Sequence, residues 1–238
     1  MGVAWVFEYP LGDATSRIGA QAVKEIERQL EAVGAERDGH YFVDSMPYRP
    51  NVNVQSGISL VYLLHHSEFP HSTFTIAPDL KERPGLARAV SDRGFDLILG
   101  KLGSGLTPDP PGKFECTGSK YVLKDFAVRV GSASMASSFK GVVVEIEYRP
   151  LSVTSMSTAL MREFVRSVLP VLSAETPTFI SRMQAHEQYY PIDTLHQYLD
   201  LFLELRKRTT LQPQPQAQPV QPSSFQPPPQ QNAPPVQQ

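Results

Sequence analysis

The chain has 238 residues, of which 41% are hydrophobic and 19% charged, and its formal net charge at pH 7 is −2. This length suits one domain with an extension, since domains commonly run to about 100–200 residues. A near-neutral charge without a basic stripe disfavours direct recognition of DNA or RNA, and the lack of an apolar run of about 18 residues disfavours a membrane-spanning helix.

The first predicted element is a strand over 3–9, which is rich in Val and aromatic residues and stops before Pro10. A helix is predicted next, because apolar residues recur every three or four positions while most charged residues lie between them. Asp13 or Thr15 is expected to cap its start, and Gly34 lies where its C-cap belongs. The apolar stripe of this helix consists of Ile18, Ala22, Ile26, Leu30 and Val33.

Short runs of β-branched and aromatic residues then predict strands over 40–45, 58–70 and 71–77. The Pro- and Asn-containing segment 47–57 is interpreted as a break between strands. The segments 47–57 and 78–92 carry no pattern that indicates a role.

In the middle of the chain, one short helix is predicted before a further group of strands. Apolar residues at helical spacing predict a short helix over 94–102, and "PDPPG" at 108–112 predicts a loop. Four strands in a meander are predicted after it, with glycines near the breaks between them. These strands are 114–118, 119–124, 125–134 and 139–148, and the glycines are Gly118, Gly131 and Gly141.

Two helices close the folded part. The first covers 157–172, where Pro170 must kink or end it. Its predicted stripe is Leu160, Phe164, Val168 and Leu172, widened by Met161, Val165 and Leu169. The second covers 191–207, with a predicted stripe of Ile192, Leu195, Leu199, Phe202 and Leu205. The order of helix, strands and helices predicts an α+β fold around a large antiparallel sheet, and leaves open whether the sheet closes into a barrel.

The C-terminal segment 209–238 has a different composition from the rest of the chain. It holds ten Gln, nine Pro and a single aromatic residue, Phe225, with no charged residue. Such a segment buries too little apolar surface to offset the entropy of ordering, so we predict a folded domain over 1–208 and a disordered tail over 209–238. The short basic run Arg206–Arg208 before the tail is more typical of a helix C-terminus than of a phosphate-binding site.

The N-terminus gives no targeting signal. It lacks a basic region and carries Glu8, unlike a secretory signal. Gly2 suggests myristoylation, but that motif requires Ser or Thr at position 6, where this chain has Val6. We therefore expect a soluble intracellular protein.

Glu145 and Glu147 share one face of a predicted strand, because successive side chains point to opposite faces. Barrel hydrolases that attack triphosphates use two or more such acid pairs to hold a divalent cation, whereas this chain offers one pair on a strand. If 125–131 pairs with 141–148 as a hairpin, Arg129 falls near Glu145 on the same face. A cross-strand ion pair needs no catalytic role, so we predict that the two carboxylates lie on the solvent-facing side of a structural sheet.

The histidine-rich segment at 65–71 suggests a zinc site, since it holds His65, His66, Glu68 and His71. Adjacent residues of an extended strand point in opposite directions, so His65 and His66 cannot both reach one ion. Pro70 turns the chain before His71. We therefore predict no metal site here.

No nucleophile stands out either. Cys116 is the single cysteine, which rules out an intramolecular disulfide and fits a reducing compartment. The nearest basic residue is Lys113, so we expect no lowered thiol pKa and interpret Cys116 as a small filler residue. Neither a G-x-S-x-G elbow nor a G-K-[ST] phosphate loop occurs. We predict no catalytic, cofactor-binding or metal-binding residue and no cofactor; the alternative is a divergent metal-dependent triphosphate hydrolase of tunnel-barrel type.

Four sequence words occur in a fixed order along 1–208. They are "HHSEFP" at 65–70, "GSKYVLKDFAVRVG" at 118–131, "GVVVEIEY" at 141–148 and "YYPIDTLHQY" at 189–198. In these words the chain resembles the Mediator complex subunit 20 family, also called TRF-proximal protein.

This resemblance implies an incomplete β-barrel flanked by an N-terminal helix and two C-terminal helices. It also implies a non-catalytic, nuclear subunit in the head module of the Mediator coactivator, which bridges gene-specific regulators to RNA polymerase II. The expected partners are Mediator subunit 18, as a heterodimer, the C-terminal helix of Mediator subunit 8 through that pair, and other head-module subunits. RNA polymerase II would be contacted indirectly, with no sequence-specific nucleic acid and no membrane bound.

Overall fold

A single curled sheet organises the chain. The computed structural model describes residues 2–11, 16–51, 59–78, 88–102, 105–172, 175–184 and 187–211. Within these residues the strand order is β1-β9-β8-β7-β2-β3-β4-β5, with β6 paired to β2, and every pair is antiparallel. The strands are β1 (Val3–Tyr9), β2 (Glu36–Pro50), β3 (Val61–His66), β4 (Ser72–Ile76), β5 (Arg88–Asp92), β6 (Leu106–Pro108), β7 (Phe114–Leu123), β8 (Phe126–Met135) and β9 (Ser138–Tyr148).

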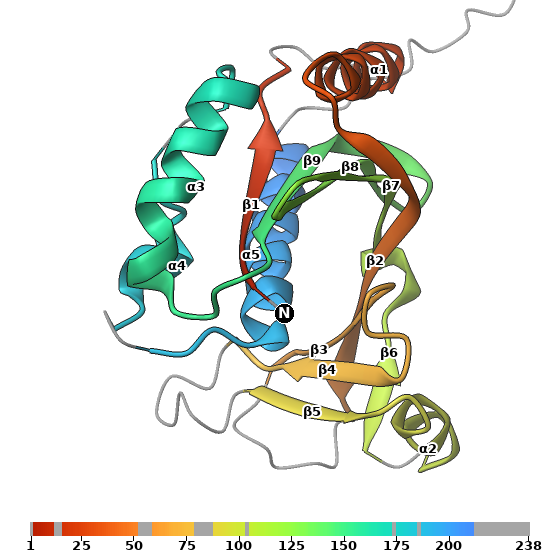
Figure 1. Ribbon diagram of the computed structural model, residues 1–238. Helices are drawn as coiled ribbons and strands as arrows, with labels where there is room; N and C mark the ends of the chain where they lie inside the picture. The colour runs from red at the N-terminus through yellow and green to blue at the C-terminus, as the bar shows by residue number, and fades with distance from the viewer. Residues whose placement is uncertain are drawn as a thin grey trace, which may run out of the picture.

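Helices surround this sheet. They are α1 (Ser16–Ala32), α2 (Phe95–Leu102), α3 (Thr154–Val168), α4 (Thr178–Arg182) and α5 (Pro191–Leu211), with a 3₁₀ turn at Pro110–Gly112. In Figure 1, β7, β8 and β9 arch over the top of the molecule, β3, β4 and β5 lie at the bottom, and α5 runs behind β1. The sheet does not close: β1 and β5 are its ends within the described residues, and α5 contacts both. The predicted α+β class is therefore confirmed, with an open antiparallel sheet.

Both faces of the central strands are buried. The outer face of β1, β8 and β9 packs against α1 and α3, and its core includes Val144 and Ile146. The inner face packs against α5, whose Leu195, Leu199 and Phe202 are at most 1% exposed. No helix in the described part of the chain is long and apolar enough to cross a lipid bilayer.

The predicted meander contains three strands where four were expected, because 114–123 is one strand. Gly118 was interpreted as a break, but it lies inside β7 opposite Gly131 of β8. A Cβ atom on Gly118 would lie 1.9 Å from the carbonyl oxygen of Val130, so this glycine permits a close approach of two backbones. The expectation of a break over 47–57 is also wrong at its start, since β2 continues to Pro50. Proline lacks an N–H, but the carbonyl of Pro47 still accepts a hydrogen bond from Asp109 at 2.8 Å.

The predicted helices are confirmed with changes at their ends. In α1, Ile26 and Leu30 are fully buried, whereas Ile18 is 40% exposed; Val33, which follows the last helical residue Ala32, is 45% exposed. Gly34 has a φ of +88°, which agrees with its predicted role as C-cap. The caps predicted at Asp13 or Thr15 lie outside the described residues.

The C-terminal helices differ from the prediction at one stripe residue, Leu160, and include one element that was not predicted. The predicted stripe of α3 included Leu160, which is 41% exposed, while its neighbour Met161 is fully buried. The helix ends at Val168, before Pro170, as expected. The five-residue helix α4 was not predicted. All five predicted stripe residues of α5 are buried, and the helix runs to Leu211; the predicted tail lies outside the described residues from 212 onward.

Candidate functional site

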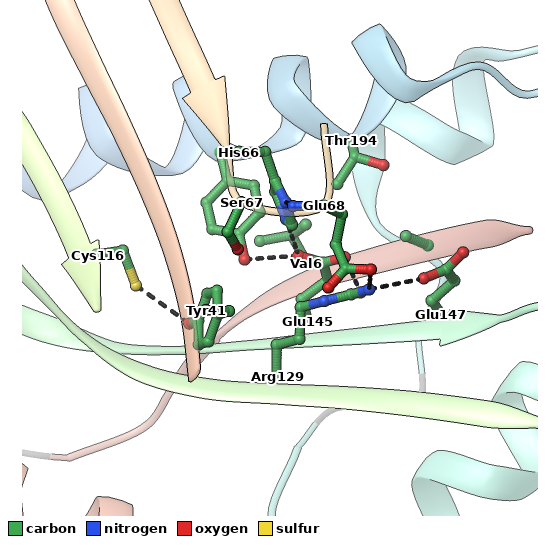
Figure 2. Close-up of polar contacts among 12 residues, drawn as sticks. Val6, Tyr41, His66, Ser67, Glu68, Cys116, Arg129, Glu145, Glu147 and Thr194 are labelled. Carbon is green, nitrogen blue, oxygen red and sulfur yellow. Dashed lines mark hydrogen bonds and ion pairs between the residues drawn. The ribbon is translucent and has the colours of Figure 1, made fainter. Parts of the chain in front are cut away.

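A buried ion-pair network lies on the inner face of the sheet. The pairing of β8 with β9 brings its two central residues together. Arg129 of β8 is directly opposite Glu145 of β9, which confirms the predicted pairing. Glu147 follows two residues later on the same face, and His66 ends β3 across the curl of the sheet. Glu68 comes from the turn after β3. Figure 2 shows these side chains converging on the Arg129 guanidinium.

Arg129 pairs with three carboxylates. Its Nη1 donates to Glu145 Oε1 at 2.6 Å, and its Nη2 donates to Glu147 Oε2 at 3.0 Å and lies 3.2 Å from Glu68 Oε2. Arg129 and Glu145 are each 1% exposed, and Glu147 is 7% exposed. The prediction of a solvent-facing side is therefore wrong. The curl of the sheet brings the end of β3 over these residues, and α5 covers the rest of the inner face, so this side of the strand is also internal.

The second oxygen of Glu145 accepts two further hydrogen bonds. His66 Nε2 donates at 3.0 Å and the hydroxyl of Tyr198, from α5, donates at 2.8 Å. His66 Nδ1 accepts the backbone N–H of Glu68 at 3.1 Å, so the proton of a neutral His66 resides on Nε2. Burial alone would raise the pKa of Glu145, but Arg129, His66 and Tyr198 outweigh it and lower the pKa from 4.5 to about 2. Glu145 is therefore an anion held in place by three donors.

The outer part of the network reaches the protein surface through Glu68. Lys120 Nζ lies 3.0 Å from Glu68 Oε1 and 3.0 Å from Asp38 Oδ2. Burial tends to raise the pKa of Glu68, whereas Arg129 and Lys120 lower it, and the net direction is downward. At the opposite side, Glu147 Oε1 accepts the backbone N–H of Gly2 at 3.0 Å.

The geometry leaves the predicted acid pair without a free coordination position. Each of the four carboxylate oxygens of Glu145 and Glu147 accepts at least one hydrogen bond. Arg129 occupies the place where a divalent cation would bind between them. Across the described ranges, no three His, Cys, Asp or Glu side chains converge as metal ligands would. The arrangement provides a fixed internal support for three strands, and offers no reactive group to a substrate.

His65 and His66 point away from each other, which confirms the prediction from strand geometry. His65 Nδ1 lies 2.7 Å from Asp44 Oδ1, and its Nε2 lies 2.9 Å from Asp96 Oδ2 on α2. His66 instead joins the Glu145 network. The two histidines therefore serve different clusters.

Cys116 is fully buried on the inner face of β7, and its sulfur lies 3.2 Å from the hydroxyl of Tyr41. Burial raises the pKa of the Cys116 thiol to about 12, despite the opposing hydrogen bond with Tyr41. A thiol in this environment stays protonated at neutral pH and packs as a small apolar group.

The sequence predicted one contact of this network, Arg129 with Glu145, but missed the four other residues that contact Arg129, Glu145 or Glu147 directly. These are His66, Glu68, Tyr198 and Gly2, which come from segments distant in the sequence. Two signals were present in the words "HHSEFP" and "YYPIDTLHQY", which contain three of the four. Neither sequence pattern predicts which side chains contact one another.

Comparison with known proteins decides the family. A family model described as the TATA-binding related factor (TRF) of subunit 20 of the Mediator complex matches residues 1–203. The chain belongs to this Mediator subunit 20 family. The family comprises non-catalytic subunits of Mediator, which acts in RNA polymerase II transcription, as the resemblance implied.

Curated Mediator subunit 20 proteins from several animals match nearly the whole chain. The protein from Caenorhabditis briggsae is 40% identical over 210 residues, covering 88% of this chain and all of that protein. The Aedes aegypti protein is 34% identical over 219 residues, and the Homo sapiens protein is 33% identical over 214 residues; this chain covers 97% and 96% of them.

Solved structures are similar to this chain at lower sequence identity than these relatives. A Pyrococcus horikoshii protein gives a TM-score of 0.43 at 12% identity, covering 77% of this chain and all of that one. A chain of the Schizosaccharomyces pombe Mediator head module gives 0.32 at 12% identity, covering 87% and 94%.

Proposed function

We propose that this chain is a scaffold subunit of the Mediator head module, where it pairs with Mediator subunit 18. The C-terminal helix of subunit 8 holds this pair, and the assembly helps to bridge gene-specific regulators to RNA polymerase II in the nucleus. The family match over residues 1–203 supports this proposal, because it spans nearly all of the predicted folded domain.

The observation that best supports a structural role for Glu145 and Glu147 is the hydrogen-bonded network around Arg129. A reaction centre needs groups that are free to meet a substrate, whereas the Glu145 and Glu147 oxygens are all engaged by protein donors. The inner face around the network is filled by side chains of α5, including Tyr198 and Phe202. Function is therefore assigned to the outer surface, through binding of other subunits.

The proposal is tested by co-expression with Mediator subunit 18 and affinity capture. Three proteins are compared: the full-length chain, the chain ended at Leu211, and residues 212–238 fused to an inert carrier. We expect the first two to capture subunit 18 equally and the carrier fusion to capture none. Loss of capture on removing only 212–238 would contradict the assignment of pairing to the folded domain.

Subunit 8 provides the second step of the test. A peptide of its C-terminal segment is added to the captured pair and to this chain alone. We expect stable retention on the pair and little on the single chain. Equal retention on the single chain would show that subunit 8 does not depend on the pair.

A further inference from the structure

A polar pocket lies between α3 and α4, which are next to each other at the left of the molecule in Figure 1. Because α3 packs on the outer face of the sheet, this pocket is separate from the Arg129 network on the inner face. Its volume is about 710 Å³, within the range of about 300–1,000 Å³ that is usual for ligand sites. The pocket is therefore large enough for several residues of a bound peptide.

Two arginines of α3 supply the positive charge of the pocket. Arg162 and Arg166 are four residues apart, so they are neighbours on one face of the helix, and Thr158 continues the same stripe toward its start. Both arginines are exposed, whereas Met161 and Val165, which follow the adjacent stripe, are buried. The helix thus presents two adjacent guanidinium groups to the pocket.

Most hydrogen-bond donors of these arginines are unused within the described part of the chain. Arg162 Nη2 donates to the hydroxyl oxygen of Thr176 at 3.0 Å, while the Arg166 side chain has no hydrogen bond or ion pair with any described residue. Because Thr176 accepts this bond, its own hydroxyl hydrogen is available to donate. Ser155, in the first turn of α3, adds another hydroxyl to the lining.

The lining combines a net positive charge with an apolar wall. Its two arginines face one carboxylate, Glu175, so positive charges exceed negative ones by one. The apolar wall consists of Ile180, which is 4% exposed, and Met183, which directly follows α4. A ligand that suits this lining carries negative charge at one position and an apolar group beside it.

We propose that this pocket binds a phosphorylated serine or threonine of another protein, with the phosphate held by Arg162, Arg166 and Thr176. A phosphate monoester carries a charge of about −1.5 to −2 at pH 7 and has three strong acceptor oxygens. A carboxylate has one charge and two oxygens, so it leaves part of this donor set unused. Arginine also matches the geometry of phosphate, because its planar fork donates two parallel hydrogen bonds.

A nucleic acid or an anionic membrane fits the pocket less well. Both present many phosphates over an extended area, and their binding requires a broad basic surface. Here the two arginines stand between carboxylates, since Glu175 lines the pocket and Glu163 lines the shallow groove on the other side of the arginines. The positive charge is therefore local, as recognition of a single phosphate group requires.

The test uses the full-length protein and two pools of short fluorescent peptides. Both pools have serine at the central position and mixed residues elsewhere, and the serine is phosphorylated in one pool only. Binding is measured by fluorescence anisotropy at pH 7.5. We expect the phosphorylated pool to bind at least about tenfold more tightly, because charge-assisted hydrogen bonds are the strong ones. Equal binding of the two pools would overturn the proposal.

Variants locate the binding to this pocket. Arg162→Gln and Arg166→Gln should each weaken binding of the phosphorylated pool by about tenfold or more. The matched control is Arg182→Gln, because Arg182 is an exposed arginine of α4 that lines the neighbouring groove beside β1. All three substitutions are on the surface and should leave thermal unfolding unchanged. Equal effects of the three, or no effect at Arg162 and Arg166, would overturn the proposal.

Competition identifies the source of the phosphate. Inorganic phosphate, oligothymidylate and vesicles of phosphatidylserine are each added to the protein with the phosphorylated pool bound. We expect none of them to displace the peptides at an equal concentration of phosphate groups. Displacement by inorganic phosphate would show a simple anion site, and displacement by the oligonucleotide or the vesicles would show a nucleic-acid or membrane site; each of these results would refute binding of a phosphorylated protein segment.

Discussion

Replacing Arg129 by methionine is the sharpest test of the network. The substitution keeps a long apolar stem and removes the guanidinium that contacts Glu68, Glu145 and Glu147. Breaking a buried ion pair by removing one partner typically costs about 3–5 kcal/mol, because it leaves the other charge internal and unpaired. The lowering of the Glu145 pKa from 4.5 to about 2 leads to a similar figure, roughly 3 kcal/mol at about 1.4 kcal/mol per pKa unit.

The pH dependence follows from the sign of that pKa change. In the native protein the folded-state pKa of Glu145 is depressed, so its stabilising contribution is present above the unfolded pKa and is lost as the pH falls from about 4.5 toward 2. Without Arg129, burial raises the pKa of Glu145, and the Arg129→Met variant gains relative stability when Glu145 is protonated. The difference in unfolding free energy should therefore be largest at pH 7, begin to narrow above pH 4.5 as Glu145 of the variant takes up a proton, and narrow further below pH 4.5 as the native protein loses the contribution of Glu145.

The assay is urea unfolding at pH 7, 5 and 4, with the folded fraction monitored by circular dichroism. The matched control is Arg28→Met, which removes an arginine from an ion pair with Glu25 whose side chains are 75% and 64% exposed. Exposed pairs contribute about 0–1 kcal/mol, so this variant should unfold near the native midpoint. A loss at Arg129 no larger than at Arg28, or one that does not change with pH, would refute the assignment of Arg129 as the internal counterion.

The remaining predictions concern the core. Met161→Ala should lower the free energy of unfolding by about 2–4 kcal/mol, because Met161 is fully buried. Leu160→Ala should change it by about 0.5 kcal/mol or less, because Leu160 is 41% exposed. Equal losses of the two variants in urea unfolding would contradict the observed face of α3. Cys116 should react with a thiol reagent at pH 8 only as fast as the protein unfolds, because burial raises its pKa to about 12; rapid labelling of the native protein would show an accessible thiolate.

Elements with a strong period could be predicted from sequence, and elements set by distant contacts could not. The stripe of α5 was correct because five apolar residues at helical spacing define one face of any helix. The stripe of α3 was wrong at Leu160 because several apolar residues there allow two neighbouring faces. The choice between them depends on where β1 and β9 lie.

The candidate site shows the same division. Alternation along β9 correctly put Glu145 and Glu147 on one face, and hairpin register correctly put Arg129 beside Glu145. The residues of β9 and its neighbours in the sequence do not decide whether that face is exposed to solvent, since antiparallel sheets commonly leave one side solvated. The curl of the sheet brought His66 and Glu68 over the acids and made the face internal.

The sequence alone determined the type of most helices and strands, the pairing of Arg129 with Glu145, and, through four ordered words, the resemblance to the Mediator subunit 20 family. Tertiary structure decided which faces are buried, and so turned the paired acids from surface groups into an internal charge cluster. The reason is that side-chain periodicity is fixed by neighbours a few residues away, whereas burial and charge balance depend on segments such as Gly2 and Tyr198 that meet only after the sheet has curled.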